Sequence, residues 1–551
     1  MEQLKTVSKI NFDIIVIGGG ITGAGIALDA TLRGLKVILF EKKDFASGTS
    51  SKSSKLVHGG LRYLEHYKFG LVRESLRERS VLRKIAPHQV HTLPFLIPIY
   101  KHQKPPAILM RIGLWVYDIL AQGNLGWHKW KNPKKTLELV PTLQKENLKG
   151  SGYYFDAQMN DSRLNIEVIM TAQSNGAQIF NYTEVVEFLH ENNNIEGRVY
   201  GVVVQNKDTQ EKFAIKGNLV INATGAWGDC VAKMENPSAP KILGVSKGSH
   251  IIVKQVLNQK LAVVVTMKDG RITFVLPFNK EYTIIGTTDT FYDADIEEIL
   301  ASEDDISYLL EGTNKLFPKL NLRNTDIISA YSGVRPLVYT QKEGLALASD
   351  VSREDKIITS QTGLITIVGG KFTTYRKMGK RVTDLAIKEL KKDKKITKKL
   401  LPCLTAKTPL FGGEIDNWEK FQKEKFPKVK DELSCTDDTA NMLIKMYGSK
   451  IDQFISLTKE NPDKNKKLSN LLPYLQTQVI YAIMYELIIH LDDFMLRRTT
   501  IYLEQGQGLD CVDVVGELMK DKLKWTESQK QAEILAYTQY IDRLNNFISK
   551  N

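Results

Sequence analysis

Three glycines between two short apolar runs restrict the fold of this chain more than any other feature. Residues 14–17 form a continuous β-rich apolar run, which is typical of a strand covered on both faces. Gly18, Gly20 and Gly23 follow in the spacing G-x-G-x-x-G, and residues 37–40 form a second apolar run. Strand, tight turn, helix and second strand in this order predict a Rossmann-like unit that binds a dinucleotide.

Each glycine has its own task in such a unit. The first permits the turn, the second lets a pyrophosphate approach the backbone, and the third lets helix and strand pack closely. The helix N-terminus offers N–H groups to the pyrophosphate. Glu41 ends the second strand, at nearly the spacing from Gly23 expected of an acid that binds ribose hydroxyls. Its charge would repel a 2′-phosphate, which disfavours NADP.

The segments that follow favour FAD over NAD. Residues 42–55 form a loop rich in Ser, Thr and Gly, suited to an extended cofactor, and Gly59 and Gly60 leave room for a flat ring. A further predicted strand, residues 219–222, ends in Ala-Thr-Gly. Another predicted strand ends in a glycine pair and leads into a helix whose first turn holds Thr373. That helix start would present its positive end to the pyrimidine edge of a flavin.

The order of these motifs resembles a known family. GGGITGAGIALDA, TSSKSSKLVHGGLRYLEH, NATGAW, KGSHIIV, YSGVRPL and GGKFTTYRK follow one another as in FAD-dependent glycerol-3-phosphate dehydrogenases, of the glycine-oxidase-like flavoprotein superfamily. The resemblance covers nearly the whole chain. It implies oxidation of sn-glycerol 3-phosphate to dihydroxyacetone phosphate, with electrons passed to a membrane quinone. The related glycerophosphate oxidases pass them to oxygen.

The resemblance and the side-chain chemistry together give the expected substrate site. Arg335 and Arg62, with Arg271 as a third candidate, would bind the phosphate, because a guanidinium can donate two parallel N–H bonds to it. Tyr63 and Lys371 would orient the hydroxyl groups. The substrate is a dianion, so a cationic pocket beside the flavin is a chemical requirement.

The proton acceptor is expected to be His250. Histidine titrates near neutral pH and suits general-base work, and the family has a histidine of this motif in its active site. His250 would take the C2 hydroxyl proton as hydride moves to flavin N5. His58 is the rival, but its place beside Gly59 suggests a flavin contact. Arg335 is the alternative stabiliser of a developing alkoxide.

The cofactor site is expected to draw on every motif of the resemblance, and Lys371 and Thr373 would stabilise negative charge on the reduced flavin. The expected cofactor-binding residues are Gly18, Gly20, Gly23, Glu41, Thr49, Ser50, Ser51, Ser54, Lys55, Leu56, His58, Gly59, Val185, Ala223, Gly225, Gly333, Gly370, Lys371, Phe372 and Thr373. No metal site is expected, because the four cysteines lie far apart with no paired spacing.

The expected fold class is α/β: a Rossmann-like FAD-binding domain, an antiparallel-sheet substrate domain and a C-terminal α-helical domain. We assign residues 1–85, 151–235 and 330–380 to the first, 86–150 and 236–329 to the second, and 381–551 to the third. The apolar segment 108–120 is interpreted as a helix with Trp115 in the core rather than at a membrane.

Charge and composition bear on location and partners. The net charge is +13, which favours anionic partners. No signal peptide or membrane span is predicted, so we expect a cytoplasmic protein held peripherally on the inner face of the cell membrane. The lysine-rich helical segment 376–399 would either lie on an anionic bilayer or dock with a solvated lysine face. A homodimer is left open.

Two other functions compete with the quinone-linked dehydrogenase. The first is an oxygen-dependent glycerophosphate oxidase. The resemblance implies that such oxidases are longer chains with an insertion after YSGVRPL, and residues 331–371 of this chain leave no room for that insertion. A basic flavoprotein that binds nucleic acid would interleave basic and aromatic residues on one face. The lysines here concentrate at 376–399 and 419–430, largely without aromatics, so no nucleic-acid partner is expected.

Overall fold

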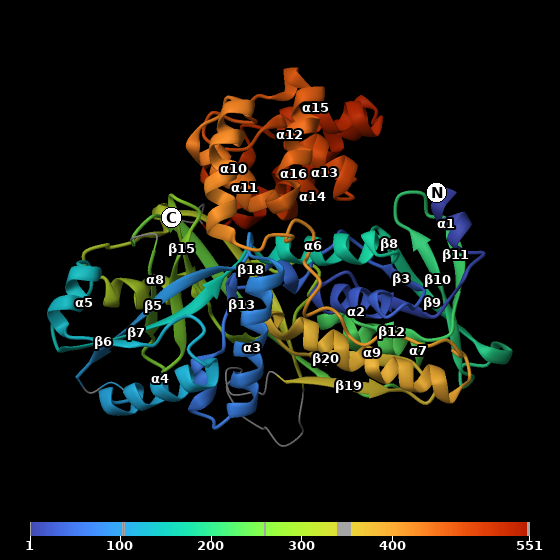
Figure 1. Cartoon of the computed structure of the whole chain (residues 1–551), viewed down its shortest axis with the longest axis horizontal. Coiled ribbons are helices and arrows are strands. Elements are labelled where there is room, and N and C mark those ends of the chain that lie inside the picture. Colours follow the sequence, from blue (N-terminus) through green and yellow to red (C-terminus); the bar gives the residue numbers. More distant parts are fainter. Residues whose placement is uncertain (1, 102, 104, 258–259, 339–353, 548–551) are drawn as a thin grey trace.

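The computed structural model of the chain describes residues 2–101, 103, 105–257, 260–338 and 354–547. These residues form three β-sheets, flanking helices, and a C-terminal group of helices at the top of Figure 1. The architecture is the expected α/β class, with a Rossmann-like sheet, a large antiparallel sheet and a C-terminal helical domain.

A six-stranded sheet carries the glycine-rich turn. Its strands are parallel except β19, which runs antiparallel to β20. Their order is β19 (Asp355–Thr359), β20 (Ile365–Gly369), β12 (Val220–Asn222), β2 (Ile14–Ile17), β3 (Val37–Phe40) and β8 (Gln178–Phe180). All four residues of β2 are buried, which explains its unbroken apolar run. Helix α2 (Ile21–Leu32) packs against α6 (Asp161–Ser174) and α9 (Tyr375–Lys392).

A ten-stranded, mostly antiparallel sheet forms the second large layer, on the left of Figure 1. Its main path is β17 (Thr290–Phe291), β13 (Leu243–Lys254), β16 (Tyr282–Gly286), β15 (Ile272–Phe278), β14 (Ala262–Thr266), β5 (His91–Tyr100), β7 (Leu148–Gln158) and β4 (Leu56–Val57), with β18 (Ile327–Val338) on β13 and β6 (Lys129–Lys131) on β7. Residues 330–338, assigned from the sequence to the cofactor-binding part, therefore lie in β18 of this sheet.

A third, four-stranded sheet and several helices complete the part of the fold that precedes the C-terminal helices. The sheet has the order β1 (Asn11–Phe12), β11 (Lys212–Gly217), β10 (Val199–Asn206) and β9 (Thr183–His190). The remaining helices before the C-terminal group are α1 (Glu2–Val7), α3 (Phe69–Ile85), α4 (Ala107–Ala121), α5 (Pro133–Leu139), α7 (Gly228–Glu235) and α8 (Glu303–Leu316).

The C-terminal helices pack on the ten-stranded sheet, and their π-helical turn contacts α6. They are α10 (Trp418–Leu433), α11 (Asp437–Tyr447), α12 (Ile451–Glu460), α13 (Gln476–Tyr485), α14 (Leu491–Asp493), α15 (Val512–Leu523) and α16 (Glu527–Leu544), with a π-helical turn at Phe494–Arg498. One apolar core includes side chains of the ten-stranded sheet and of α13, α15 and α16. This shared core ties the helical domain to the sheet.

Two helices bear on interpretations that the sequence left open. In α9 the apolar residues Met378, Val382, Ala386 and Leu390 are buried, so this helix docks and exposes its lysines. The expectation that Trp115 lies in the core is wrong, because Trp115 is 55% exposed on α4. Helix α4 instead turns Leu114, Tyr117 and Ala121 inward, and these three are buried.

Candidate active site

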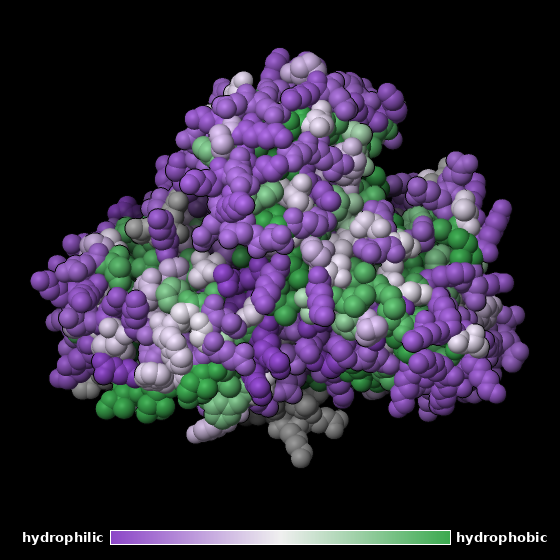
Figure 2. All heavy atoms as spheres, viewed as in Figure 1, coloured by the Kyte–Doolittle hydropathy of each residue, from purple (hydrophilic) through white to green (hydrophobic). Residues whose placement is uncertain are grey.

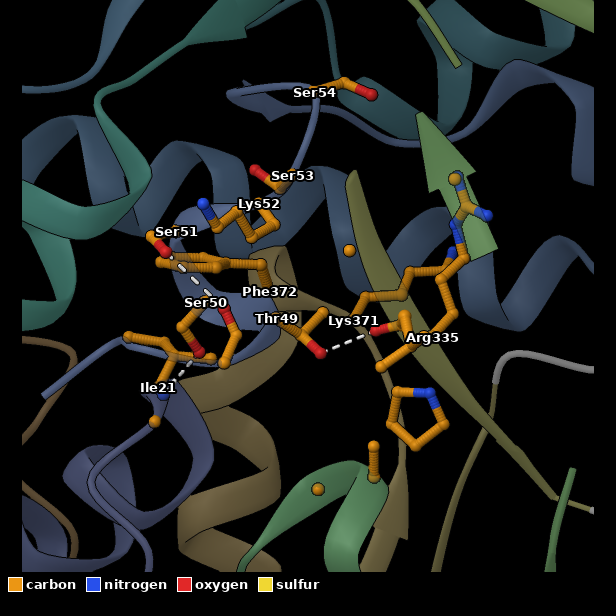
Figure 3. Close-up of a pocket in the computed structure, with 18 of the residues that line it drawn as sticks. Ile21, Thr49, Ser50, Ser51, Lys52, Ser53, Ser54, Arg335, Lys371 and Phe372 are labelled. Carbon is orange, nitrogen blue, oxygen red and sulfur yellow. Dashed lines mark hydrogen bonds between the residues drawn. The ribbon is translucent and has the colours of Figure 1, made fainter. Parts of the chain in front are cut away.

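A large cavity lies where the carboxyl ends of β2, β3 and β12 face the ten-stranded sheet, and its volume is about 1750 Å³. Drug-sized ligands occupy roughly 300–1000 Å³, so this space can take an extended molecule. In open α/β sheets, ligands bind at the carboxyl ends of the strands. Figure 3 shows residues 49–54, Arg335 and Lys371 among those that line it.

The glycine-rich turn has the geometry that each glycine was expected to require. Gly18 has φ +108°, and a Cβ on it would lie 2.8 Å from the carbonyl oxygen of Ala223. A Cβ on Gly23 would lie 1.9 Å from the carbonyl oxygen of Gly18, so any side chain there would push helix α2 off the turn. Gly20 faces Ser50, whose Oγ would lie 3.2 Å from an added Cβ. The turn thus presents bare backbone to the cavity.

Glu41 and the polar loop complete this end. The Glu41 carboxylate accepts hydrogen bonds from the backbone N–H groups of Gly19 (2.7 Å) and Lys43 (2.9 Å). Burial raises the pKa of Glu41 despite these bonds. Ser50 Oγ accepts from the Ile21 N–H at 2.9 Å, and Thr49 Oγ1 donates to the Val334 carbonyl at 2.5 Å (Figure 3). The loop is therefore fixed against the start of α2 and against β18 of the ten-stranded sheet.

The residues at this end fit FAD. Bare glycine backbone and the start of α2 suit a pyrophosphate, and Glu41 is the acid expected to bind ribose hydroxyls. At the opposite end of the cavity, the buried Nδ1 of His250 has no hydrogen-bond partner within the described ranges, as expected of a group that faces a ligand. The residues that would hold FAD are those of the Gly18–Gly20 turn, Glu41, the loop 49–54 and Leu56.

All but three of the expected site residues line the cavity. The three exceptions are Gly23, Lys55 and Gly59. Gly23 packs under the turn. Lys55 points away, because its Nζ binds Asp161 Oδ1 at 2.5 Å and its side chain is 3% exposed. Gly59 donates its N–H to Tyr117 OH at 3.0 Å. A direct cofactor role for these three residues stays a prediction.

Arg335 lies flat against strand β13 at the other end of the cavity. Its Nη2 occupies the space beside Gly248, where an added Cβ would come within 2.1 Å. The guanidinium donates to Asp289 Oδ1 (3.1 Å), Thr287 Oγ1 (2.8 Å) and the Thr288 carbonyl (3.2 Å). Three acceptors on one segment and a glycine beneath the guanidinium define its plane.

The other expected cations surround the same space. Lys371 Nζ lies 3.7 Å from the centroid of the Tyr63 ring, a cation–π contact. Arg271 donates from Nη1 to the Asp289 carbonyl at 2.9 Å. Arg62 lies next to Tyr63 in the short helix Leu61–Leu64. Three arginines and a lysine at one end of the cavity make it suitable for a small dianion.

His250, on β13, lies near Arg335 of β18, and its side chain is fully buried. Its ring fills the space beside Gly286, where an added Cβ would lie 2.2 Å from Cδ2. The ring stacks on Tyr331 with centroids 4.6 Å apart, and Nε2 lies 2.8 Å from Ser54 Oγ. Burial, with the charges of Arg335 and Lys55, holds the pKa of His250 well below its usual value. The imidazole is therefore neutral at physiological pH.

Sequence reasoning missed the segment 286–289, Gly-Thr-Thr-Asp. It makes room for His250 and supplies the acceptors for Arg335. The available signal was a glycine, and an acid three residues later, directly after residues 282–285, Tyr-Thr-Ile-Ile, a short run typical of a strand. Gly248 was also missed, although it stands two residues before His250. Their roles depend on the pairing of β13 with β16 and β18, which no local pattern gives.

The C-terminal helices also reach the cofactor loop. Buried Asp44 binds both Arg497 and Arg498 of the π-helical turn. Lys52 Nζ donates to Tyr540 OH of α16 at 3.1 Å, and it lies over the rings of Tyr502 and Tyr540. The helical domain, whose role the sequence left open, thus holds the loop that joins Glu41 to the substrate end.

Comparisons with known proteins agree with this geometry. Residues 13–384 match the family described as FAD dependent oxidoreductase, and residues 403–530 match the C-terminal domain of alpha-glycerophosphate oxidase. The chain is 37% identical to the aerobic glycerol-3-phosphate dehydrogenase of Staphylococcus aureus (strain USA300), over 98% of this chain and 95% of that one. The enzyme of the same name from Staphylococcus haemolyticus is also 37% identical, over 96% and 93%.

Solved structures give the same result. The glycerol-3-phosphate dehydrogenase of Bacillus halodurans, solved in complex with FAD, has a TM-score of 0.82 and 32% identity, covering 100% of this chain and 98% of that one. The L-alpha-glycerophosphate oxidase of Mycoplasma pneumoniae shares the fold, with a TM-score of 0.51 and 17% identity over 71% of this chain and 96% of that one. The chain therefore belongs to the FAD-dependent oxidoreductases, in the family that contains the aerobic glycerol-3-phosphate dehydrogenases.

Proposed function

We propose that the protein oxidises sn-glycerol 3-phosphate to dihydroxyacetone phosphate and passes the electrons to a membrane quinone. When bound, FAD supplies the acceptor for the hydride from C2. The names of the relatives support the substrate, and the charge of the cavity supports it independently. The chain's own residues have three tasks: to bind the phosphate, to orient the hydroxyl groups and to take the C2 hydroxyl proton.

One observation carries the proposal. Arg335 and His250 stand on neighbouring strands, and each fills a space that a glycine leaves open, Gly248 and Gly286 respectively. A guanidinium that binds phosphate and a neutral imidazole therefore face one cavity from fixed positions. Preorganised groups of this kind cost no reorganisation during the reaction. Arg62 and Arg271 add positive charge to the end of the cavity assigned to the phosphate, and Lys371 is assigned the hydroxyl groups.

His250 is assigned the C2 hydroxyl proton. Its neutral ring has a nitrogen available to accept, but the nearby Arg335 and Lys55 disfavour the charged form. A bound phosphate dianion offsets those charges and raises the pKa of His250, because an opposite charge favours the protonated ring. Proton transfer thus becomes favourable once the substrate is in place. Ser54 Oγ, at 2.8 Å from Nε2, fixes the ring orientation.

The apolar face of α4 supports a peripheral membrane position. Within the described ranges, no helix is long and apolar enough to cross a membrane. Large apolar side chains are nevertheless exposed on and beside α4: Ile108, Leu109, Ile112, Trp115, Ile119 and Trp127. A green patch lies over this helix at the lower left of Figure 2. A contiguous exposed patch of this kind is typical of a membrane or partner surface, and tryptophan favours the lipid interface.

The same helix lines the cavity. Leu109, Met110 and Gly113 of α4 are among the residues that line the cavity. An apolar quinone entering from the bilayer would meet this wall first. This supports a quinone as acceptor and the inner face of the cell membrane as location, with α4 rather than the lysine-rich α9 as the contact surface.

An anaerobic flavin assay tests the proposal. Glycerol 3-phosphate should bleach the FAD absorbance of the purified holoenzyme near 450 nm, a general property of reduced flavin. The Arg335→Ala holoenzyme should bleach only at much higher substrate concentration. Re-oxidation by a short-chain quinone in anionic vesicles should then outpace re-oxidation by air. Steady release of hydrogen peroxide in step with substrate use would instead identify an oxygen-dependent oxidase.

A further inference from the structure

Asp289 contacts two of the three arginines of the substrate end. Its Oδ1 accepts from Arg335 Nη1 at 3.1 Å, and its backbone carbonyl accepts from Arg271 Nη1 at 2.9 Å. It stands between β16 and β17 and lines the cavity with both arginines. One residue thus contacts a cation of β18 and a cation directly before β15, and these two lie far apart in the sequence.

The surroundings leave Arg335 one well-defined place. Its guanidinium lies against Gly248, where an added Cβ would come within 2.1 Å of Nη2. Thr287 Oγ1 and the Thr288 carbonyl accept from Nη2, and Asp289 accepts from Nη1. Because a guanidinium is planar and rigid, acceptors along one edge fix the direction of all five N–H donors.

The carboxylate also sets the charge of the arginine pair. Removing one negative charge beside a guanidinium increases the attraction of the site for an anion. It also loosens the orientation, and a misplacement of about 1 Å can cost about 100-fold in rate. Affinity for a phosphate and the rate of hydride transfer should then move in opposite directions when the charge is removed.

We propose that Asp289 is a positioning residue that orients Arg335 and Arg271 for a phosphomonoester and limits how tightly they hold it. The inference rests on the proposed function, in which the phosphate of the substrate lies against these arginines. Asp289 itself is not assigned a contact with substrate or cofactor.

Asp289→Asn in the holoenzyme tests the inference, because asparagine keeps an acceptor oxygen and the backbone carbonyl but loses the charge. Inorganic phosphate, titrated by its perturbation of the FAD absorbance, should bind about 3- to 10-fold more tightly than to the wild type. The maximal rate of anaerobic FAD reduction by glycerol 3-phosphate should fall about 10-fold. Asp326→Asn, the same change at an exposed position near the start of β18, should alter neither value by more than 2-fold.

The outcomes separate the two proposals. A merely structural role would weaken phosphate binding and rate together, or change neither, and either result overturns the inference. If the wild type is not reduced by glycerol 3-phosphate, yet phosphate binds more tightly to Asp289→Asn, the proposed substrate fails and the positioning role stands. Gly248→Ala should weaken phosphate binding, because the added Cβ displaces the Arg335 guanidinium from its position against Gly248 and leaves Asp289 intact. Unchanged phosphate binding by that variant would contradict the fixed placement of Arg335.

Discussion

Replacing Asp44 by Asn should loosen the cofactor loop from the C-terminal helices. Asp44 is fully buried. Its carboxylate accepts from Arg497 Nε at 2.5 Å and from Arg498 Nη1 and Nη2 at 2.6 and 3.0 Å. Burial alone would raise the pKa of Asp44, but the two guanidiniums lower it from 3.8 to about 2. A shift of nearly two units corresponds to about 2 kcal/mol in favour of the folded state at neutral pH.

The expected loss is somewhat larger than that pH-dependent part. Removing one partner of a buried ion pair typically costs about 3–5 kcal/mol, because a charge is left buried without its counter-charge. Arg497 keeps Asp493 and Arg498 keeps the Glu486 carbonyl, so we expect the low end, about 3 kcal/mol. Heating the holoenzyme should release fluorescent FAD several degrees earlier than in the wild type, with the urea midpoint lowered in parallel.

The direction of the pH dependence follows from the lowered pKa. The contribution of Asp44 is complete above about pH 4 and is lost as the pH falls through about 2. The stability gap between wild type and Asp44→Asn should therefore shrink in acid. Asp384→Asn is the matched control, since Asp384 pairs with Arg33 and Lys380 but is 44% exposed; such pairs contribute about 0–1 kcal/mol. Equal melting and FAD release in wild type and Asp44→Asn would refute the reasoning.

Three further predictions test other parts of the site. Gly23→Ala should yield protein with little bound FAD, because the new Cβ would lie 1.9 Å from the Gly18 carbonyl oxygen; Gly70→Ala, which meets no atom within 4 Å, should keep its FAD content. At low substrate concentration, where the rate reports the free enzyme, FAD reduction should show no histidine break between pH 8 and pH 6 beyond the ionisation of the substrate phosphate itself, because the pKa of His250 lies well below its usual value; an additional break near 6.5 would contradict that lowered pKa. Trp115→Ser with Ile112→Ser should reduce co-sedimentation with anionic vesicles at least several-fold and leave the melting temperature nearly unchanged, since both side chains are more than half exposed; unchanged sedimentation would remove α4 as the membrane surface.

The cofactor end was predictable because its signals are local. The strand 14–17, the three glycines, the helix and Glu41 follow one another within a single βαβ unit, and the packing of each depends on near neighbours. The same holds for the loop 49–54, whose small polar residues line the cavity as expected. Where the contacts of a short segment are made mostly within that segment, composition and spacing are enough to predict its structure.

The substrate end was only partly predictable, because its supports come from paired strands. The sequence pointed to Arg335 and His250 but not to Gly248 and Gly286, whose missing side chains make room for them. Their adjacency follows from the registers of β13 with β16 and β18. The prediction that Trp115 lies in the core was wrong for a related reason. An apolar stripe gives the period of a helix, but it does not say whether protein or another surface covers the stripe.

The C-terminal helices link cofactor binding to the folding of the whole chain. Asp44 and Lys52 belong to one loop, and both are held from the helical domain, by Arg497 with Arg498 and by Tyr540. The same loop carries Thr49 and Ser50 to the cavity, so bound FAD would contact a loop that the helical domain also holds. A ligand that binds only the folded loop stabilises every contact that depends on it, by about 2.7 kcal/mol at a hundredfold excess over its Kd. Removing FAD should therefore weaken the docking of the C-terminal helices, and loosening those helices should weaken FAD binding by the same free energy.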